Sequence, residues 1–500
     1  MKVHKEKCTG CGYCLLTCPV GAVESDGWAS VREEKCTLCG LCAPVCPNDA
    51  ISLDVPLKEP ERRYETQYDV VIIGSGIGGL MTAAALAKDD RRVAVFEKLS
   101  FIGGRYTEID HAGYALTTGA WTSLGPKSHI GEFLAELGVE VEYVSLRDKG
   151  YDQQFSIRFQ DGREFPSLQA MLPREDWRAY VRAIVRGRKM ELDEASTRDY
   201  IEEQVMNDDL MAAVNAIAAT ASGVNADNFP ASEYIVVSRD SAKAGLDFAC
   251  TVGGVRTLIE SLADVIAAHG GQISTQTEVS RVLLERGSAT GIELRNGDQV
   301  EADTVIHNGG IGRFVKLVGP ENLPPDYLTR VEKLVPVDCA AIILGTTEPL
   351  FTEAPILMTP GTDRVVGIFE STFLDPTIAP PGKRMFDVFL PLYSEDRARE
   401  LELAMGDLRA LFPNLDDILD MVVPMFFTGA WPGSESGQTV GQVGDQRLDP
   451  RSPIPNLYLV GMDVIGSGAA GDLIPVGVRR LLEYFQCDAL RIAPVGIHPE

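Results

Sequence analysis

Residues 68–98 read YDVVIIGSGIGGLMTAAALAKDDRRVAVFEK, and this stretch decides the fold. It begins with a short apolar, β-branched run, Tyr68 to Ile73, which is typical of a buried parallel strand. A glycine-rich turn follows over residues 74–79, and then a helical segment of small residues from Met81 to Lys88. A second apolar run, Arg92 to Phe96, completes the pattern. The order strand, turn, helix, strand predicts a βαβ unit, and therefore an α/β fold with a Rossmann-type sheet.

The glycines of this turn match the G-x-G-x-x-G pattern of a dinucleotide site. Gly74 allows the tight turn, Gly76 lets the backbone approach a pyrophosphate, and Gly79 lets helix and strand pack closely. The helix N-terminus offers unpaired N–H groups to the phosphates. Glu97 ends the second strand 18 residues after Gly79, where a carboxylate accepts hydrogen bonds from ribose hydroxyls. The pattern therefore predicts a dinucleotide-binding site.

The residues after the second strand indicate which dinucleotide binds. Glu97-Lys98-Leu-Ser-Phe-Ile-Gly103-Gly104-Arg105 resembles the Glu-Lys…Gly-Gly-Arg signature of the FAD-dependent amine oxidase and phytoene desaturase superfamily. In that superfamily the Gly-Gly-Arg turn contacts the pyrophosphate, and an arginine suits this role through bidentate contact with phosphate. The resemblance therefore implies FAD as the cofactor.

The resemblance continues in separated blocks over about residues 68–490. Residues 270–279 resemble the strand that passes the adenine, where Val279 would lie. Residues 455–463 resemble the C-terminal flavin motif, with Asp463 in the place of a residue that contacts the ribityl chain or a phosphate. The match is closest to the phytoene desaturase-like branch, which includes carotenoid desaturases, carotenoid isomerases and retinol saturases. The FAD-binding residues that it implies are Gly74, Gly76, Ile77, Gly78, Gly79, Glu97, Lys98, Gly104, Arg105, Val279, Gly461, Asp463 and Ile474.

Eight of the eleven cysteines lie within residues 8–46, as two runs of Cys-x-x-Cys-x-x-Cys-x-x-x-Cys-Pro with a period of 28 residues. In bacterial ferredoxins of this spacing, the fourth cysteine of each run ligates the other [4Fe–4S] cluster. Structural zinc is the alternative, but zinc sites use four ligands, commonly as two Cys-x-x-Cys pairs. Residues 1–55 resemble a two-cluster ferredoxin. We expect one cluster on Cys8, Cys11, Cys14 and Cys46, and a second on Cys36, Cys39, Cys42 and Cys18.

Charge and hydropathy exclude several classes of function. The formal net charge is −26, which argues against nucleic acid as a partner and against electrostatic docking on anionic lipid. The N-terminus has no apolar signal core, and no stretch reaches the roughly 18 apolar residues of a membrane span. Peripheral contact with a membrane stays open. Cysteines clustered in a chain without a signal peptide favour metal ligation in a reducing cytoplasm.

The same patterns predict how the chain is divided. We expect a ferredoxin domain over 1–55, a linker over 56–66 and a discontinuous FAD-binding domain. An α+β substrate or cap region should fill the rest, with helices that include one from Ser196 to Ala219. The segments expected for the FAD domain are 67–125, 250–315 and 452–490, and those for the cap are 126–249 and 316–451.

The sequence assigns no catalytic acid or base. His307 precedes Asn308 at the end of a strand that leads to the cofactor, and Tyr114 lies in a motif close to the flavin. A buried packing role is the alternative for His307, and a structural hydrogen bond is the alternative for Tyr114.

Together these features suggest an FAD-dependent oxidoreductase that receives or donates electrons through its own ferredoxin module. The resemblance implies an apolar, isoprenoid or lipid-like substrate, and C=C reduction, desaturation or isomerisation as the reaction. A redox partner protein would exchange electrons with the clusters. The alternative is an electron-transfer subunit that relays between a ferredoxin and a larger redox complex, with no organic substrate. An enclosed apolar cavity beside the flavin would favour the enzyme, and a flavin edge at a flat open surface would favour the relay.

Overall fold

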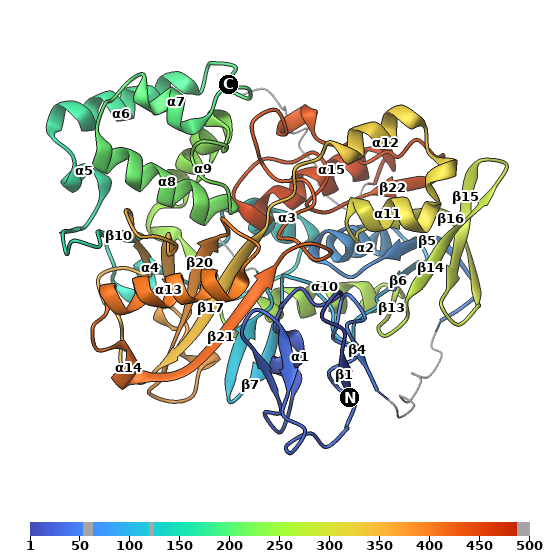
Figure 1. The fold of residues 1–500 in the computed structure, drawn as a ribbon. Coiled ribbons are helices and arrows are strands. Elements are labelled where there is room, and N and C mark those ends of the chain that lie inside the picture. The colour runs from blue at the N-terminus through green and yellow to red at the C-terminus, as the bar shows by residue number, and fades with distance from the viewer. Residues whose placement is uncertain (54–63, 120–124, 488–500) are drawn as a thin grey trace.

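The computed structural model describes residues 1–53, 64–119 and 125–487. Most of the predicted linker over 56–66 lies outside these ranges. Two seven-stranded sheets dominate the molecule and stand side by side, and the small N-terminal module lies below the junction between them (Figure 1). The architecture is α/β around the first sheet and α+β around the second.

The first sheet contains the predicted βαβ unit. Strand β5 pairs in parallel with β6 on one side and with β16 on the other, and β22 extends the parallel part beyond β16. In order across the sheet the strands are β13 (Gln272–Ser274), β6 (Val93–Phe96), β5 (Gln67–Ile73), β16 (Gln299–His307), β15 (Ser288–Leu294) and β14 (Val279–Glu285), with β22 (Leu457–Leu459) beside β16. Residues Val70–Ile73 of β5 and Val93–Phe96 of β6 are buried, and both are continuous apolar runs, as parallel strands covered on both faces require.

Helices cover both faces of this sheet. On one face, a core of aliphatic side chains joins the strands to α2 (Ile77–Lys88), α3 (His129–Leu137), α10 (Val255–Ala268) and α15 (Ile474–Tyr484). On the other face, the opposite side chains of the same strands pack against α11 (Ile311–Val318), with α12 (Pro325–Glu332) at its edge. Helix α2 consists mostly of alanine, glycine and leucine, and these small side chains let it lie close to β5 and α10.

The second sheet is built mainly from antiparallel pairs. In order its strands are β11 (Glu164–Phe165), β10 (Phe155–Arg158), β18 (Ile356–Met358), β19 (Gly367–Glu370), β20 (Arg384–Pro391), β17 (Cys339–Thr346) and β21 (Leu419–Phe427). Its two faces pack into separate cores, one against α8 and its neighbours and one against α13. The helices of this half are α4 (Leu146–Lys149), α5 (Leu168–Met171), α6 (Arg174–Gly187), α7 (Thr197–Glu202), α8 (Asp208–Ser222), α9 (Ala231–Ala244), α13 (Arg397–Leu411) and α14 (Leu415–Ile418).

The helix predicted from Ser196 to Ala219 is wrong as a single element, because it divides into α7 and α8. Asn207 starts the second helix, since its side chain accepts a hydrogen bond from the Leu210 N–H at 3.0 Å. An asparagine that caps a new helix competes with continuation of the old one.

The N-terminal module shares a hydrophobic core with the rest of the chain. It consists of α1 (Tyr13–Thr17) and two antiparallel strand pairs, β1 (Lys2–Val3) with β4 (Ile51–Ser52) and β2 (Val23–Ser25) with β3 (Ala29–Val31). Tyr13 and Leu16 pack in one cluster with Leu116 of β8 and Met425 of β21. The remaining pairs are β7 (Glu108–His111) with β8 (Tyr114–Thr117), and β9 (Tyr143–Ser145) with β12 (Ala249–Thr251). The module is therefore an integral part of the fold.

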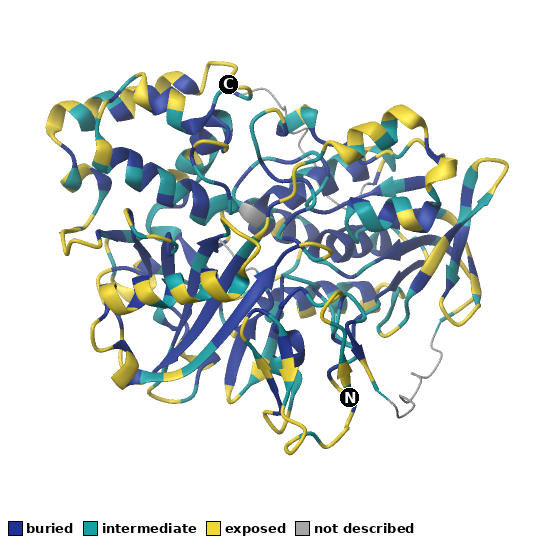
Figure 2. Ribbon diagram, viewed as in Figure 1, coloured by how far each residue is buried: buried dark blue, intermediate teal, exposed yellow. Residues whose placement is uncertain are grey.

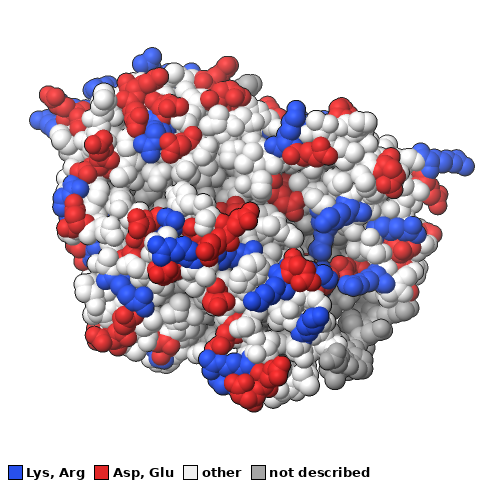
Figure 3. Space-filling model, in the orientation of Figure 1, with Lys and Arg blue, Asp and Glu red and all other residues white. Residues whose placement is uncertain are grey.

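Burial and charge follow this arrangement. The central strands of both sheets are buried, whereas exposed residues gather on outer helix faces, on loops and on the outer strand β14 (Figure 2). Acidic and basic side chains are interspersed on the face shown in Figure 3. Among the described residues, no helix is both long and apolar enough to span a bilayer.

Candidate functional site

A cavity of about 1100 Å³ lies where the two sheets and the N-terminal module meet. Twelve of the thirteen residues implied for FAD line it, although they come from segments as far apart as Gly74 and Ile474. The thirteenth, Gly79, lies behind the turn: a Cβ on Gly79 would stand 2.5 Å from the Gly74 carbonyl oxygen. That position suits the packing role expected from the motif.

The glycine turn forms the floor of the cavity. Gly74 has a left-handed backbone, with φ of 96°, and its N–H donates to the Phe96 carbonyl at 2.8 Å. Helix α2 begins after Gly76, so the N–H groups of its first turn have no partner within the helix. Gly76, Ile77 and Gly78 line the cavity at this helix end. The donors and the positive end of the helix dipole fit a pyrophosphate.

Glu97 lies at the end of β6 and lines the same cavity. One of its carboxylate oxygens accepts from both the N–H and the hydroxyl of Ser75, each at 2.7 Å. The other oxygen accepts from the Leu99 N–H at 2.8 Å. Glu97 thus ties the glycine turn to the second strand, and the oxygen that accepts from Leu99 keeps lone-pair capacity for a ribose hydroxyl.

Lys98 and Arg105 line the cavity with different partners. Lys98 donates to the Pro47 carbonyl at 3.1 Å and to Asp49 at 2.9 Å, so it joins the cavity wall to the N-terminal module. Arg105 donates to the Pro432 carbonyl, and its guanidinium lies 5.1 Å from the centre of the Trp431 ring. These contacts hold the Arg105 side chain in the cavity wall.

The remaining FAD-binding residues that the resemblance implies, Val279, Gly461, Asp463 and Ile474, also line the cavity. Gly78 faces Ile474 and Gly461, because an added Cβ there would stand 3.0 Å from Ile474 and 3.2 Å from Gly461. Asp463 accepts from the N–H groups of Ile311 at 3.0 Å and Ser436 at 2.9 Å. Val279 also lines the cavity, at the start of β14.

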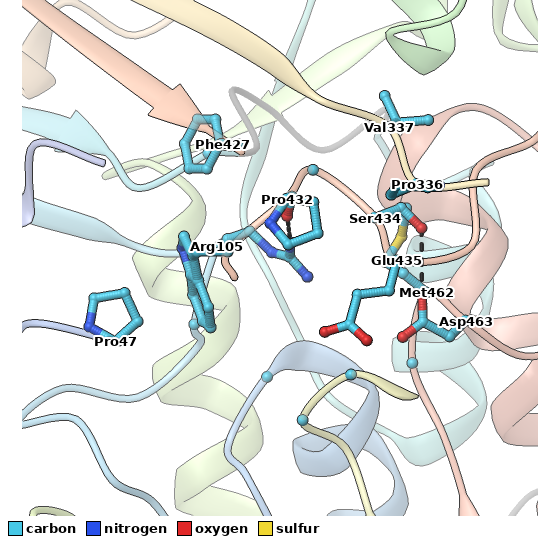
Figure 4. Close-up of a pocket in the computed structure, with 18 of the residues that line it drawn as sticks. Pro47, Arg105, Pro336, Val337, Phe427, Pro432, Ser434, Glu435, Met462 and Asp463 are labelled. Atoms are coloured by element: carbon cyan, nitrogen blue, oxygen red, sulfur yellow. Dashed lines mark hydrogen bonds between the residues drawn. The ribbon is translucent and has the colours of Figure 1, made fainter. Parts of the chain in front are cut away.

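Sequence reasoning missed Glu435. It lies on the loop after β21, accepts a hydrogen bond from the Gly312 N–H, and points into the same part of the cavity as Asp463 (Figure 4). Burial raises the pKa of Glu435, and the negative charge of Asp463 raises it further. The glycine- and serine-rich run over 429–437 was the available signal, since such loops often line sites.

One part of the cavity wall is apolar. Ala219 of α8, Val337, Ala340 of β17 and Phe389 and Leu390 of β20 line it. These residues belong to the second sheet and to the helices that cover it. An apolar organic molecule that entered here would lie between this wall and the glycine turn.

The eight cysteines of the module lie in two groups of four. A second, small cavity is lined by four of them, Cys8, Cys11, Cys14 and Cys46. Burial raises the pKa of the Cys11 thiol to about 12, with further contributions from Cys46 and Cys8.

The other four thiols form a second group. Burial raises the pKa of Cys42 to about 11, and here the contributing neighbours are Cys39, Cys18 and Cys36. In each group the fourth cysteine comes from the other run. Among the described residues, no three His, Cys, Asp or Glu side chains converge as ligands of one metal ion.

Backbone donors serve the sulfur atoms in the same repeat. The Ala22 N–H donates to Cys18 Sγ, and 28 residues later the Ala50 N–H donates to Cys46 Sγ, both at 3.2 Å. The Ala29 N–H lies 3.5 Å from Cys8 Sγ. Hydrogen bonds to sulfur stabilise thiolate ligands and tune cluster potentials, so these residues fit iron–sulfur clusters.

His307 and Tyr114, the weak catalytic candidates, are not among the residues that line the cavity. His307 is buried, its Nε2 lies 2.8 Å from the Gly310 carbonyl, and burial lowers its pKa to about 4. The Tyr114 hydroxyl donates to Asp420 at 2.9 Å. The chain turns at Asn308, so Asn308 faces the cavity while His307 packs against Phe314.

Fold and site together define a flavoprotein with an integral iron–sulfur module, and comparison with known proteins agrees. Residues 77–472 match the family described as flavin containing amine oxidoreductase, and residues 1–53 match a 4Fe-4S dicluster domain. The chain belongs to the flavin containing amine oxidoreductase family. It is a flavin- and iron–sulfur-dependent oxidoreductase that resembles the phytoene desaturases and carotenoid isomerases.

Individual relatives are distant. An uncharacterized protein of Methanocaldococcus jannaschii is 26% identical, over 83% of this chain and 98% of its own. The chloroplastic prolycopene isomerase of Arabidopsis thaliana is 24% identical, over 77% of this chain and 73% of its own. A solved oxidoreductase from Methanosarcina mazei is 28% identical with a TM-score of 0.74, and the match covers 83% of this chain and 99% of that one.

Proposed function

We propose that this chain binds FAD and two [4Fe–4S] clusters, and that it exchanges electrons between a redox partner and an apolar organic substrate. The substrate class is isoprenoid or lipid-like, and the reaction is C=C reduction, desaturation or isomerisation. The cytoplasm suits the eight cysteines that cluster within residues 8–46, because a reducing compartment favours metal ligation over disulfides.

The observation that best supports the proposal is that one cavity borders the cluster module, the glycine turn and the apolar wall. Cys8 and Thr9 of the cluster module, the glycine turn over 74–78 and the apolar wall at Phe389 and Leu390 all line it. Its volume of about 1100 Å³ exceeds the roughly 300–1,000 Å³ of common ligand pockets, which supports room for both a dinucleotide and a substrate.

The chain's own residues would hold and enclose the reactants. The helix α2 N-terminus would bind the pyrophosphate and Glu97 the ribose of an adenosine diphosphate, and Asp463 would offer acceptor oxygens to hydroxyls. FAD, when bound, supplies the electron chemistry. Ala340 and Phe389 exclude water from the substrate side, and Glu435 is the nearby acid whose pKa burial raises, so it can hold a proton.

Anaerobic purification with flavin and iron counted tests the cofactor assignment. We expect about one FAD and about eight iron atoms per chain. Mass spectrometry of an organic extract of the same sample should identify a bound apolar molecule. A chain without flavin, or one that holds a single zinc per cysteine group, would contradict the proposal.

Electron flow through the clusters has its own test. Replacing both Cys36 and Cys39 by serine should prevent a low-potential donor from reducing the flavin, while the FAD content stays near that of the wild type. Unchanged flavin reduction and unchanged turnover in this variant would sink the idea. Cys250→Ser and Cys487→Ser are matched controls, since both cysteines are buried far from the two runs in sequence.

The relay without organic substrate predicts a flavin edge at an open, flat surface. The apolar wall of the cavity favours the enzyme instead. A carotenoid-type polyene whose absorption bleaches or shifts on incubation with the reduced protein would support the enzyme. Electron transfer to a partner at the full rate, with no molecule bound at the apolar wall, would support the alternative.

A further inference from the structure

The 28-residue repeat allows the two halves of the cluster module to be compared position by position. Gly10 corresponds to Leu38, Tyr13 to Leu41, and Asn48 to Val20. Each of these residues lies between or just after the cysteines of one cluster. Gly10, Tyr13 and Asn48 therefore belong to the face of the first cysteine group, which is Cys8, Cys11, Cys14 and Cys46. Leu38, Leu41 and Val20 belong to the equivalent face of the second group, which is Cys36, Cys39, Cys42 and Cys18.

The face of the first group is covered by the chain itself. Tyr13 is fully buried, and its hydroxyl donates to the Thr118 carbonyl at 2.6 Å and accepts from the Trp431 indole N–H at 3.3 Å. The Gly10 carbonyl accepts from the Phe426 N–H of β21 at 3.0 Å. A side chain at Gly10 would collide with the Gly27 carbonyl. This face is closed, and it borders the large cavity through Cys8 and Asn48.

The face of the second group is open. Leu38 and Leu41 are each 48% exposed and Val20 is 41% exposed, and Cys39 is exposed where its counterpart Cys11 is buried. Three of the nine large apolar side chains that are exposed in the described residues thus surround one cluster site. Isolated exposed apolar residues need no explanation, but a group around a redox centre does.

Leu38 adds a second, independent observation. Its backbone is left-handed, with φ of 57°, as is that of its counterpart Gly10, with φ of 76°. Glycine adopts this conformation without penalty, whereas leucine is strained in it. Strain kept at a surface position points to a use for the side chain.

We propose that Val20, Leu38 and Leu41 form the docking patch of a one-electron carrier protein, and that electrons cross the molecular surface at the cluster held by Cys36, Cys39, Cys42 and Cys18. The inference rests on the proposed function for the presence of the clusters. The covered first group is then the one that faces the FAD cavity, and the exposed second group faces the partner. Each crossing moves one electron and no proton.

The charges around the patch describe the partner. Glu33, Glu34 and Lys35 lie exposed directly before Cys36, the first cysteine of the exposed group. Arg32, just before them, is paired with Glu24, which leaves Glu33 and Glu34 against Lys35. A carrier with an apolar contact face and a basic rim fits this surface, and attraction between them should weaken as salt increases.

Oxidised cytochrome c, a basic haem protein, is the probe. The protein is reduced with dithionite, freed of the excess and mixed with cytochrome c, whose ferric haem becomes ferrous as the cluster loses one electron. Leu38→Gly relieves the backbone strain, so it should not lower stability. Leu41→Gln removes the second apolar side chain. Leu38→Met keeps an apolar surface, and Val181→Gln with Val185→Gln on α6 changes an exposed apolar pair elsewhere.

We expect saturable electron transfer in the wild type, with a half-saturating cytochrome c concentration raised about tenfold by Leu38→Gly and again by Leu41→Gln. Ferricyanide, a small acceptor, should oxidise all variants at the same rate, and Leu38→Met and the α6 pair should behave as wild type. Non-saturable transfer, or equal transfer in all variants, would overturn the proposal. Iron content and the cytochrome c rate do not depend on flavin, so a flavin-free chain that passes this test would refute the proposed function alone.

Discussion

At the scale of single residues, Glu97 is a central hydrogen-bond acceptor of the dinucleotide site. Three donors from two different segments converge on one carboxylate that also lines the cavity. Its role is thus double, since it fixes the glycine turn and faces the ligand.

Glu97→Gln should weaken FAD binding about tenfold to a hundredfold, because a neutral amide cannot accept along both edges and each charged hydrogen bond contributes about 1.5–3 kcal/mol. Fluorescence titration of the flavin-free protein measures the change. Glu293→Gln, on the exposed side of β15, is the control and should leave the affinity unaltered. An affinity for FAD that Glu97→Gln leaves intact would show that the carboxylate is structural only.

Asp387 predicts a pH dependence of stability. It is buried in the second sheet and accepts from the hydroxyls of Ser371 and Thr117, and burial raises its pKa to about 6. Because the folded state holds the proton more tightly than the unfolded state, this stabilising contribution is complete below pH 4. It is lost as the pH rises from about 4 to about 6.

Relative to the wild type, Asp387→Asn should therefore gain about 2–3 kcal/mol of unfolding free energy between pH 4 and pH 7. Urea unfolding of both proteins at several pH values measures the difference. Asp417→Asn, at an exposed position of α14, should show no such trend. A difference between Asp387→Asn and wild type that is constant with pH would contradict the assignment.

At the scale of elements, the helix start of α2 depends on the absence of side chains. Gly79→Ala would place a Cβ 2.5 Å from the Gly74 carbonyl oxygen, so the turn must shift. We expect a lower thermal midpoint and a lower flavin content, both measurable on the purified protein. A normal flavin content in Gly79→Ala would show that the glycine turn can shift without weakening FAD binding.

Gly406→Ala is the matched control for that change and a prediction in its own right. Gly406 lies exposed within α13, and an added Cβ there meets no atom within 4 Å. Alanine should stabilise the helix by about 0.5–1 kcal/mol, because it loses less backbone entropy on folding. A fall in the unfolding midpoint would be the opposite of the expected result.

At the scale of the whole molecule, Arg397 couples the cluster module to the second sheet. It donates to the carbonyls of Cys8 at 3.1 Å and Gly27 at 3.2 Å and to the Thr428 hydroxyl at 2.8 Å, and it stacks over Trp28. The loop that carries Cys8, which lines the cavity, is thereby held from outside the module.

Arg397→Ala should lower the iron content and speed the loss of iron to a chelator, since three hydrogen bonds from a charged group disappear. Arg399→Ala is the control, two residues further along the same helix: the exposed Arg399 side chain donates to Glu402 at 2.7 Å, and this variant should behave as wild type. Equal iron retention in the two variants would show that the module folds independently of Arg397.

The sequence by itself determined the local units of this protein. The glycine turn, the strands beside it and the two cysteine runs depend on sterics and spacing within a few dozen residues, so their patterns can be read directly. The cross-repeat grouping of Cys18 and Cys46 came from the resemblance of these runs to the bacterial ferredoxin pattern.

Only the tertiary structure decided which side chains line the cavity and which cysteine group is exposed. In the folded chain Glu435 lines the cavity, whereas His307 and Tyr114 do not. Lys98 donates a hydrogen bond to Asp49 of the cluster module. The tertiary structure also covered one cysteine group with β21 and left the other exposed. These outcomes depend on packing between segments hundreds of residues apart, which no local pattern encodes.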